Sequence, residues 1–397
     1  MILGIQIQNY CVLENIKAGM LEDEVGRTEK EPRAAFSAGI DPVFPFTELV
    51  AVVGRNDTGK SIFFDALSFL SDSLVNGCVA ASSVASRGGF SRLISDKEKA
   101  FFVSSLFSLS VYVEEEKKDY YVSYEAEMDC DRNGKPFFSR EKVRAAEKKE
   151  NTSFFDVLTV ENGRGEILLN GEMKTAGIAD TRISAVSSYG SLLEYPFLTV
   201  LYQEISHWFF CDFSSSGKKD SVPAPGGHRH LNTDGSNVEN VLKYMEKEDP
   251  KAYQLFTQKI KDKIPQVRHK SQLPDSFMGS PAKLFLYLLL LEDVRPRPLL
   301  CLETPDSELY HDMVEVLAQE LRAYVINRPH SQIFLTTHNP YILESLAPQE
   351  VWNFERKEEK GKKVSVRCMA QIPIILEMYE QGVGMGAIWY AGHFDDE

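Results

Sequence analysis

The sequence has few of the features that mark a secreted or membrane protein. Its six cysteines lie far apart and form no Cys-x-x-Cys pair, which is typical of reduced thiols in a cytosolic protein. The first sixteen residues alternate apolar and polar side chains and lack the basic start and apolar core of a secretion signal. The longest apolar run, 284–291, is too short to cross a bilayer. We expect a soluble, cytoplasmic protein that has no contact with membranes.

Basic residues are also in short supply. The chain has 44 Lys and Arg against 58 Asp and Glu, a formal net charge of −14 at pH 7. Binding along a nucleic-acid backbone requires Lys and Arg gathered on one face. Acidic residues interrupt the basic stretch 139–150, and helical spacing would spread that at 259–270, so both favour solvated helix faces. The composition permits DNA contact but does not indicate it.

Size and composition indicate a globular protein of more than one part. With 397 residues, the chain is long enough for two domains or for one domain with a large insertion. Its 43% of hydrophobic residues and its mixed charge are those of a folded protein.

The strongest motif lies in residues 50–70, "VAVVGRNDTGKSIFFDALSFL", which pass from an apolar strand through a glycine-containing loop into an apolar-periodic helix. The loop fits G-x-x-x-x-G-K-[ST]. Its backbone N–H groups would form an anion nest, and the helix N-terminus adds positive partial charge. Lys60 is expected to reach the β- and γ-phosphates of a nucleotide, and the Ser61 hydroxyl is placed to bind Mg²⁺. The residues expected to contact the nucleotide are Gly54, Arg55, Asn56, Asp57, Thr58, Gly59, Lys60, Ser61 and Ile62.

A second motif is "IFLTTHNPYILESL", residues 333–346. A strand that ends in Thr-Thr-His places a polar side chain at the carboxyl edge of the sheet, where ligands bind in open α/β folds. His338 could there bond the γ-phosphate or the attacking water. Taken alone, the segment favours a surface histidine after a strand over a ligand-binding one.

The order of elements predicts an α/β protein with an insertion. Apolar strands at 48–54, 298–303 and 331–338 alternate with helical patterns, which indicates a sheet covered on both faces. Two distant lobes would assemble this sheet. The predicted segments are an N-terminal lobe 1–105, an inserted arm or lid 106–270, and a C-terminal lobe 271–397.

The inserted segment is less regular in sequence. Residues 101–116 and 118–130 show the period-two pattern of two antiparallel strands. Residues 130–190 are charged and are predicted to be irregular, apart from a hairpin at 160–172. Residues 213–236 form a long breaker-rich loop, and Pro250 is expected to interrupt the helical pattern that follows.

Together these motifs resemble the ABC-type ATPases of the RecF, SMC and OLD group, and most closely the bacterial "AAA family" ATPases of defence islands. "IQIQNYCVLENI" resembles their opening strand, and "GRNDTGKSIFFDAL" is similar to their nucleotide loop. "FLTTHNPYIL" resembles their switch-histidine segment, and "GMGAIWYAGHFDD" their closing segment. The resemblance covers both ends of the chain and the middle only loosely. It implies an ABC-type P-loop ATPase head, with a mixed sheet flanked by helices and an inserted α+β domain, that uses ATP and Mg²⁺.

The chain departs from this family at the strand before the switch. There the family has Asp-Glu-Pro, in which Asp orients the Mg²⁺ shell and Glu polarises the attacking water. Here the segment reads "LETPDSEL", with Glu303 at the position of the Asp and Thr304 at the position of the Glu. The resemblance therefore implies that Glu303 binds the metal together with Ser61. Threonine is no general base near neutral pH, and losing a base forfeits on the order of 10² to 10⁴ in rate. Asp306 and Glu308 are possible substitutes, although their spacing favours neither.

The family's signature segment, which reaches the γ-phosphate across a dimer, is also altered. An ungapped count gives "FMGSPAK", 277–283, with Met278 in the serine place, Ser280 in the glycine place and Lys283 in the arginine place. Ser280 is the residue expected to retain a weakened contact with the partner's nucleotide. In the first strand, Tyr10 and Cys11 stand where relatives carry a basic residue. Asp57 replaces a glycine of the nucleotide loop.

Three functions remain open from the sequence. The favoured one is an ATP-gated homodimer that holds or releases a separately encoded effector, a nuclease or toxin, in anti-phage defence, with hydrolysis weak or absent. The second is an active ATPase of DNA repair or recombination, and the third a scaffold that binds nucleotide only for stability. The altered "ETP" segment favours the first and third, and His338 the first two.

Other sites have little support. No nuclease pattern is legible in the chain. His228 and His230 have no second cluster of metal-ligating residues nearby in sequence, so a further metal site there is not expected.

Overall fold

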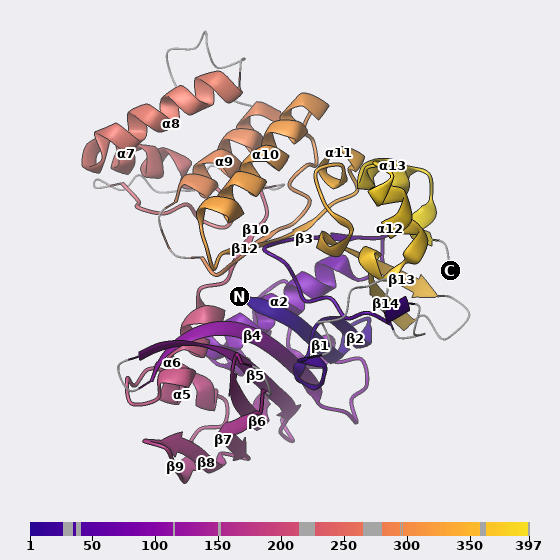
Figure 1. The fold of residues 1–397 in the computed structure, drawn as a ribbon. Coiled ribbons are helices and arrows are strands. Elements are labelled where there is room, and N and C mark those ends of the chain that lie inside the picture. Colours follow the sequence, from indigo (N-terminus) through magenta and orange to yellow (C-terminus); the bar gives the residue numbers. More distant parts are fainter. Residues whose placement is uncertain are drawn as a thin grey trace. The chain divides into compact units, whose positions relative to one another are not determined.

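The fold is taken from a computed structural model, drawn in Figure 1. The described residues are 1–26, 35–36, 41–113, 116–149, 152–213, 227–264, 280–293, 295, 297–357 and 363–395. They form two compact units, each built from two segments of the chain. The first unit consists of Met1–Trp208 and Pro348–Glu377, and the second of Phe209–Ala347 and Met378–Glu397.

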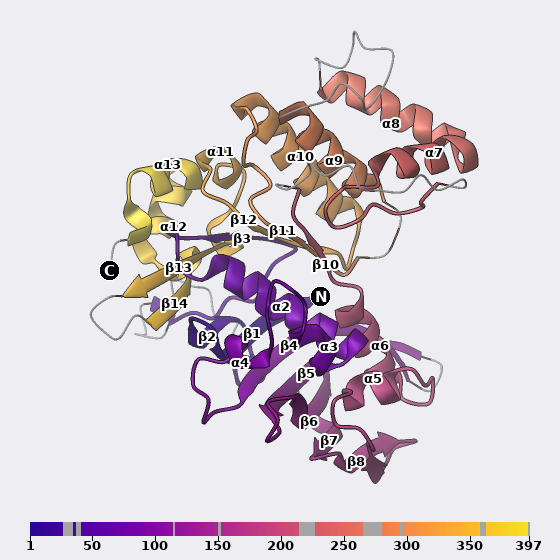
Figure 2. The same cartoon turned by 180° about the vertical axis from the view of Figure 1, so that it is seen from behind.

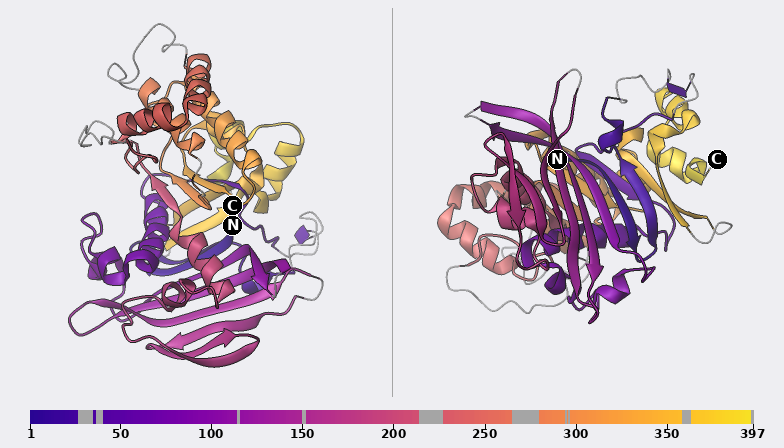
Figure 3. Two further views of the ribbon diagram at one scale, coloured as in Figure 1. Left: turned by 90° about the vertical axis from the view of Figure 1, so that its left-hand side faces the viewer. Right: turned by 90° about the horizontal axis from the view of Figure 1, so that it is seen from below.

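An eight-stranded antiparallel sheet dominates the first unit (Figure 3). Its spatial order is β2-β1-β4-β5-β6-β7-β8-β9. The strands are β1 (Ile2–Tyr10), β2 (Leu13–Gly19), β4 (Phe101–Val113), β5 (Glu116–Cys130), β6 (Pro136–Glu147), β7 (Phe155–Glu161), β8 (Arg164–Leu169) and β9 (Glu172–Gly177). The predicted strand pair β4 and β5 and the predicted hairpin β7–β8 are confirmed.

The prediction of irregular structure over residues 130–190 was wrong. Strands β6 to β9 and a helix form there. In β6, Arg140, Lys142 and Arg144 are exposed or half-buried, whereas Val143 and Ala145 between and after them are buried. Glu141, on the same face as Val143, is buried as well, and this charged residue among apolar ones hid the period-two pattern of the strand.

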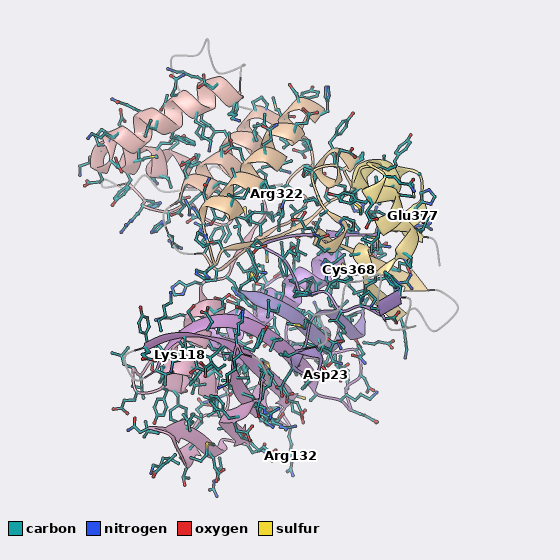
Figure 4. All side chains as sticks on the ribbon, viewed as in Figure 1. Asp23, Lys118, Arg132, Arg322, Cys368 and Glu377 are labelled. Atoms are coloured by element: carbon teal, nitrogen blue, oxygen red, sulfur yellow. The ribbon has the colours of Figure 1, made fainter. Side chains whose placement is uncertain are left out.

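A second, smaller group of strands in the first unit leads into the nucleotide loop. Strand β3 (Leu49–Val53) is wholly buried and pairs in parallel with β13 (Val351–Lys357). Strand β14 (Lys363–Cys368) pairs antiparallel with β13, and Cys368 at its end is labelled in Figure 4. Burial raises the pKa of the Cys368 thiol to about 12.

Helix α2 (Lys60–Asn76) follows the loop and extends six residues beyond the predicted end near Leu70. It ends at Gly77, whose φ of 80° favours glycine. The Phe69 ring centroid lies 5.8 Å from that of Tyr10 in β1 and 5.6 Å from that of Phe101 in β4. The Phe63 ring lies 5.3 Å from Phe354 in β13. The helix thus packs against both strand groups of the first unit (Figure 2).

Shorter helices complete the first unit. They are α3 (Cys78–Ser82), α4 (Phe90–Leu93), α5 (Ala185–Gly190) and α6 (Pro196–Ser206). The Ser71 hydroxyl of α2 donates a hydrogen bond to Ile205 O of α6 at 2.8 Å. In α6, the Phe197 ring packs edge-on against Tyr120 of β5, with centroids 4.9 Å apart. These contacts bind α6 to both α2 and the large sheet.

The second unit contains three parallel strands and most of the remaining helices. The strands are β10 (Phe209–Cys211), β11 (Leu299–Leu302) and β12 (Gln332–Thr336), paired in that order. The helices are α7 (Val238–Glu248), α8 (Pro250–Lys263), α9 (Ser280–Glu292), α10 (His311–Asn327), α11 (Pro340–Leu343) and α13 (Met385–Tyr390). Helix α12 (Pro373–Glu380) includes the point at which the chain passes from the first unit to the second.

Local sequence explains these helices. Pro250 takes the first turn of α8, where its missing N–H is no loss, and the Asp249 side chain caps that helix by accepting from Ala252 N at 3.0 Å. All residues of α9 from Lys283 to Leu291 are buried, as predicted for its apolar run. Arg322, labelled on α10 in Figure 4, donates to Ser345 O at 3.0 Å.

The boundaries of the two units differ from the boundaries of the three predicted segments. The predicted boundary between residues 105 and 106 lies inside β4, which continues the sheet begun by β1. The assembly of one sheet from two distant lobes stays a prediction. In the part of the chain that the structure describes, no helix has both the length and the apolar character to cross a membrane.

We expect Phe69→Ala to lower the free energy of unfolding by about 3 to 5 kcal/mol, because it removes a fully buried ring from between α2, β1 and β4. Urea denaturation followed by tryptophan fluorescence measures this change. The control is Leu193→Ala, since Leu193 is 90% exposed and should change stability by less than about 0.5 kcal/mol. Equal stability of the two variants would contradict the described packing of α2.

Candidate nucleotide site

The loop between β3 and α2 has the backbone of a phosphate-binding loop. Gly54 and Gly59 have φ of 135° and 97°, which glycine adopts without strain. A Cβ atom at position 54 would lie 2.2 Å from Phe354 O, so only glycine fits there. Asp57, the departure from the family's glycine, keeps the left-handed conformation with φ of 63°, which Asp tolerates better than most residues.

Lys60 begins α2 and is 8% exposed. Its ammonium donates hydrogen bonds to Gly54 O at 2.8 Å and Arg55 O at 2.7 Å. The Thr58 hydroxyl also donates to Arg55 O, at 2.9 Å. The positive charge of Lys60 is thereby held at the loop and not in open solvent.

The remaining side chains of the loop fit a magnesium nucleotide. Arg55, Asn56, Asp57 and Ser61 are exposed, and Ile62 is half-buried. The Ser61 hydroxyl in the first turn of α2 is an oxygen ligand of the kind that Mg²⁺ takes, and the helix N-terminus favours anions. Solvent reaches the Asp57 carboxylate, which limits its repulsion of a phosphate.

A partly buried network around Asp65 of α2 was not predicted from the sequence. The Tyr10 hydroxyl donates to Asp65 Oδ2 at 2.6 Å. Arg87 donates through Nε to Asp65 Oδ1 at 2.9 Å and through its terminal nitrogen to Asp72 Oδ2 at 2.7 Å. Burial, and then the Asp65 charge, raise the pKa of Tyr10 far above its usual value. Arg87 is thus a buried cation beside α2, although the first strand itself carries none at Tyr10 or Cys11.

The second group of predicted residues follows the parallel strands of the second unit. Glu303 and Thr304 come directly after β11, and one residue separates His338 from the end of β12. Because β11 and β12 are adjacent parallel strands, all three residues lie at their carboxyl edge. Glu303 is half-buried and His338 is exposed. Thr304 has a φ of 41°, an unusual conformation for a β-branched residue, and its N–H donates to Thr336 Oγ1 at 2.9 Å.

Helix α9 holds the turn 304–308 through two side chains of the predicted signature segment, Ser280 and Lys283. Lys283 is 3% exposed, and its ammonium donates to Ser307 O at 2.9 Å, to Thr304 O at 3.4 Å and to the Ser307 hydroxyl. The Ser280 hydroxyl donates to Glu308 O. Both side chains are therefore engaged within their own chain. The contact of Ser280 with a partner's nucleotide stays a prediction, and Met278 lies outside the described residues.

The two histidines of the breaker-rich loop have structural partners. His230 Nδ1 lies 2.8 Å from Asp293 Oδ1, and His228 Nδ1 lies 3.0 Å from the Asn237 side-chain nitrogen. Among the described residues, no group of three or more His, Cys, Asp or Glu is placed to hold a metal ion.

We expect Tyr10→Phe to lower the free energy of unfolding by about 1 to 2 kcal/mol, because it removes a buried hydrogen bond to a carboxylate. A double-mutant cycle with Asp65→Asn should show that the two changes are not additive. Tyr390→Phe is the matched control, because Tyr390 is 84% exposed. Strict additivity in the cycle would show that the bond contributes nothing.

A known family model matches part of the second unit. Residues 278–344 match the family model described as "AAA domain, putative AbiEii toxin, Type IV TA system". This segment includes Lys283, Glu303 and His338 but not the nucleotide loop. No curated protein sequence matches the chain.

Solved structures resemble nearly the whole chain. The SMC head bound to the C-winged helix domain of ScpA gives a TM-score of 0.52 at 12% identity, covering 92% of this chain and 96% of that one. The SMC head domain from Thermotoga maritima gives 0.42 at 13% identity, covering 92% and 98%. The head domain from Pyrococcus furiosus gives 0.38 at 13% identity, covering 96% and 99%. The similarity to the first of these structures shows that the chain has an SMC head-like fold, in which α/β sheets are flanked by helices. This fold is consistent with the predicted ABC-type P-loop ATPase head.

Proposed function

We propose that the chain binds Mg²⁺–ATP and acts as an ATP-gated homodimeric switch for a protein effector, with slow hydrolysis. The observation that carries the proposal is the loop 54–61. It combines glycines at the two positions that need them, a lysine held at the loop and an accessible hydroxyl at a helix N-terminus. The matched AAA segment and the SMC head-like fold support a nucleotide-binding ATPase of this type.

Ser61 is proposed as an oxygen ligand of Mg²⁺, since its exposed hydroxyl in the first turn of α2 suits a hard cation. The Glu303 carboxylate stays a prediction from the family pattern. When bound, the ion would neutralise the charge of the terminal phosphates. The side chain of Lys60 would bind those phosphates, for which it must exchange its hydrogen bonds to Gly54 and Arg55.

Slow turnover is proposed because of the turn after β11. Thr304 stands where the family carries the water-polarising Glu, and a hydroxyl cannot take a proton near neutral pH. Lys283, in the place of the signature arginine, is committed to backbone and hydroxyl oxygens of its own chain. His338, in the place of the family's switch histidine, is exposed after β12.

A protein partner is favoured over DNA. The solved SMC head that supports the fold is bound to a domain of ScpA, and the matched family description names a toxin of a toxin–antitoxin system. Of the basic residues on β6, Arg140 pairs with Glu161 at 3.7 Å, and Lys142 and Arg144 pair with Asp156 at 3.6 and 3.1 Å. With the net charge of −14, this favours a partner with basic patches. The anti-phage role rests on analogy with the family alone.

We expect Lys60→Ala to weaken the binding of a fluorescent ATP analogue in the presence of Mg²⁺ by about 10- to 100-fold, the size of a lost charge-assisted hydrogen bond. Equilibrium titration measures the dissociation constant. The matched control is Lys99→Ala, because the Lys99 side chain is 73% exposed and outside the loop.

Mg²⁺–ATP should also raise the melting temperature of the unmodified chain, because a ligand that binds only the folded state stabilises it. Equal affinity of the unmodified chain and Lys60→Ala would contradict the proposal. Turnover that DNA stimulates, with binding that falls steeply as salt rises, would favour a DNA-repair ATPase instead.

A further inference from the structure

Helices α7, α8 and α9 of the second unit enclose a pocket of about 420 Å³ (Figure 1). The residues that line this pocket all belong to the second unit. They lie outside the nucleotide loop and outside the turn after β11, so the pocket is formed by side chains to which no role has been given above.

Helices α7 and α8 each contribute one stripe of side chains to the pocket. Both stripes have the spacing i, i+3, i+4, i+7, which places four side chains on one face of a helix. The stripes are Val241, Tyr244, Met245 and Glu248 on α7, and Ala252, Leu255, Phe256 and Lys259 on α8. Leu231, and Leu289 of α9, add to the apolar lining. These residues form a groove between two helix faces, about two helical turns long, which we call the α7–α8 groove.

The apolar side chains of the α7–α8 groove are partly exposed. Leu255 is 74% exposed, and Tyr244 and Met245 are half-buried. Phe256, next to Leu255, is 3% exposed, and its ring packs edge-on against that of Phe285 in α9, with centroids 5.5 Å apart. A single exposed leucine is ordinary, but one that continues a half-buried apolar stripe indicates a surface that another molecule covers.

Contacts within the second unit fix the position of α8 beside the groove. Lys259 Nζ lies 2.7 Å from Glu292 Oε1 of α9 and 2.5 Å from Glu320 Oε2 of α10. The Asp249 cap fixes the other end of the same helix. The groove is therefore preformed, and a partner would not have to order it on binding.

The rim of the groove is acidic. Four carboxylates and two cations are among the residues that line it. Glu248 and Asp249 are exposed and Glu292 is half-buried, whereas the Lys259 charge is already paired with two glutamates. A second copy of the chain would bring the same acidic rim against itself in a symmetric contact, which like-charge repulsion disfavours. The charge favours a basic partner instead.

We propose that the α7–α8 groove is the docking site of the protein effector and that it accepts a basic amphipathic helix. Apolar side chains of that helix fill the groove at the spacing i, i+3, i+4, i+7, and Lys or Arg beside them pair with the rim carboxylates. The inference rests on the proposed protein partner and adds the surface and the chemistry of the contact. It does not depend on ATP.

The test is selection of binders to the purified full chain, without nucleotide, from a phage-displayed library of random peptides. We expect the enriched peptides to carry apolar residues at helical spacing among Lys and Arg. Fluorescence anisotropy of labelled synthetic copies then measures their dissociation constants.

Two variants locate the binding of these peptides in the groove. Leu255→Ser removes an exposed apolar contact and should weaken binding by about 10- to 100-fold, the size of one buried leucine side chain. Ala252→Trp fills the groove and should weaken binding at least as much. The matched control is Leu193→Ser, because Leu193 is 90% exposed and lies in the first unit. Its affinity and the melting temperatures of all three variants should equal those of the unmodified chain.

A second pair of variants tests the charge of the rim. Glu248→Lys reverses a charge that lines the groove, and Glu246→Lys reverses an exposed charge on the same helix outside the lining. The first should weaken peptide binding more than the second, and the difference should shrink as salt is added.

The outcomes decide the inference separately from the ATP switch. Selection of no peptide, enrichment of acidic peptides, or equal affinity of the unmodified chain and Ala252→Trp would overturn it. A mass of twice 44.9 kDa without nucleotide, which Ala252→Trp returns to the monomer mass, would assign the groove to a second copy and overturn it as well. Failure of the unmodified chain to bind the ATP analogue would remove the proposed switch and leave a peptide-binding groove in place.

Discussion

Burial of helix α2 is the constraint on which the first unit depends. Its apolar side chains pack against β1 and β4 on one side and against β13 on the other, with Phe69 and Phe63 at the two contacts. The same helix begins with Lys60, so the position of the ammonium is fixed by the hydrophobic core. The Arg87 cation fixes the polar side of α2 through Asp65 and Asp72. A nucleotide would therefore meet a preformed helix end and the exposed side chains of residues 55–57.

The turn after β11 differs from α2, because hydrophobic packing does not account for its conformation. Its backbone is strained, its central carboxylate is buried, and its stability comes from a lysine that the family pattern would direct outward. Such a turn is poorly explained by folding stability alone. Backbone strain of this kind clusters at functional sites.

Sequence patterns predicted the parts of the structure that depend on local order. The strand–loop–helix at 49–76, the pair β4–β5 and the buried helix α9 follow from spacing and periodicity. Strand β6 escaped prediction because its buried face carries the charged residue Glu141 among apolar ones. The Arg87 network joins residues far apart in sequence, and its only local signal is the spacing of Asp65 and Asp72 on one face of α2. The Lys283 side chain points toward the turn 304–308, whose carbonyl oxygens accept its hydrogen bonds. Residue spacing in the sequence does not reveal this contact.

The central claim is that ATP joins two copies of this chain, and the most direct test is its molar mass by light scattering with and without saturating Mg²⁺–ATP. The account predicts the monomer mass of 44.9 kDa without nucleotide and twice that mass with it. Lys60→Ala should remain at the monomer mass under both conditions. A mass that does not change with nucleotide, for a chain shown to bind it, would contradict the account.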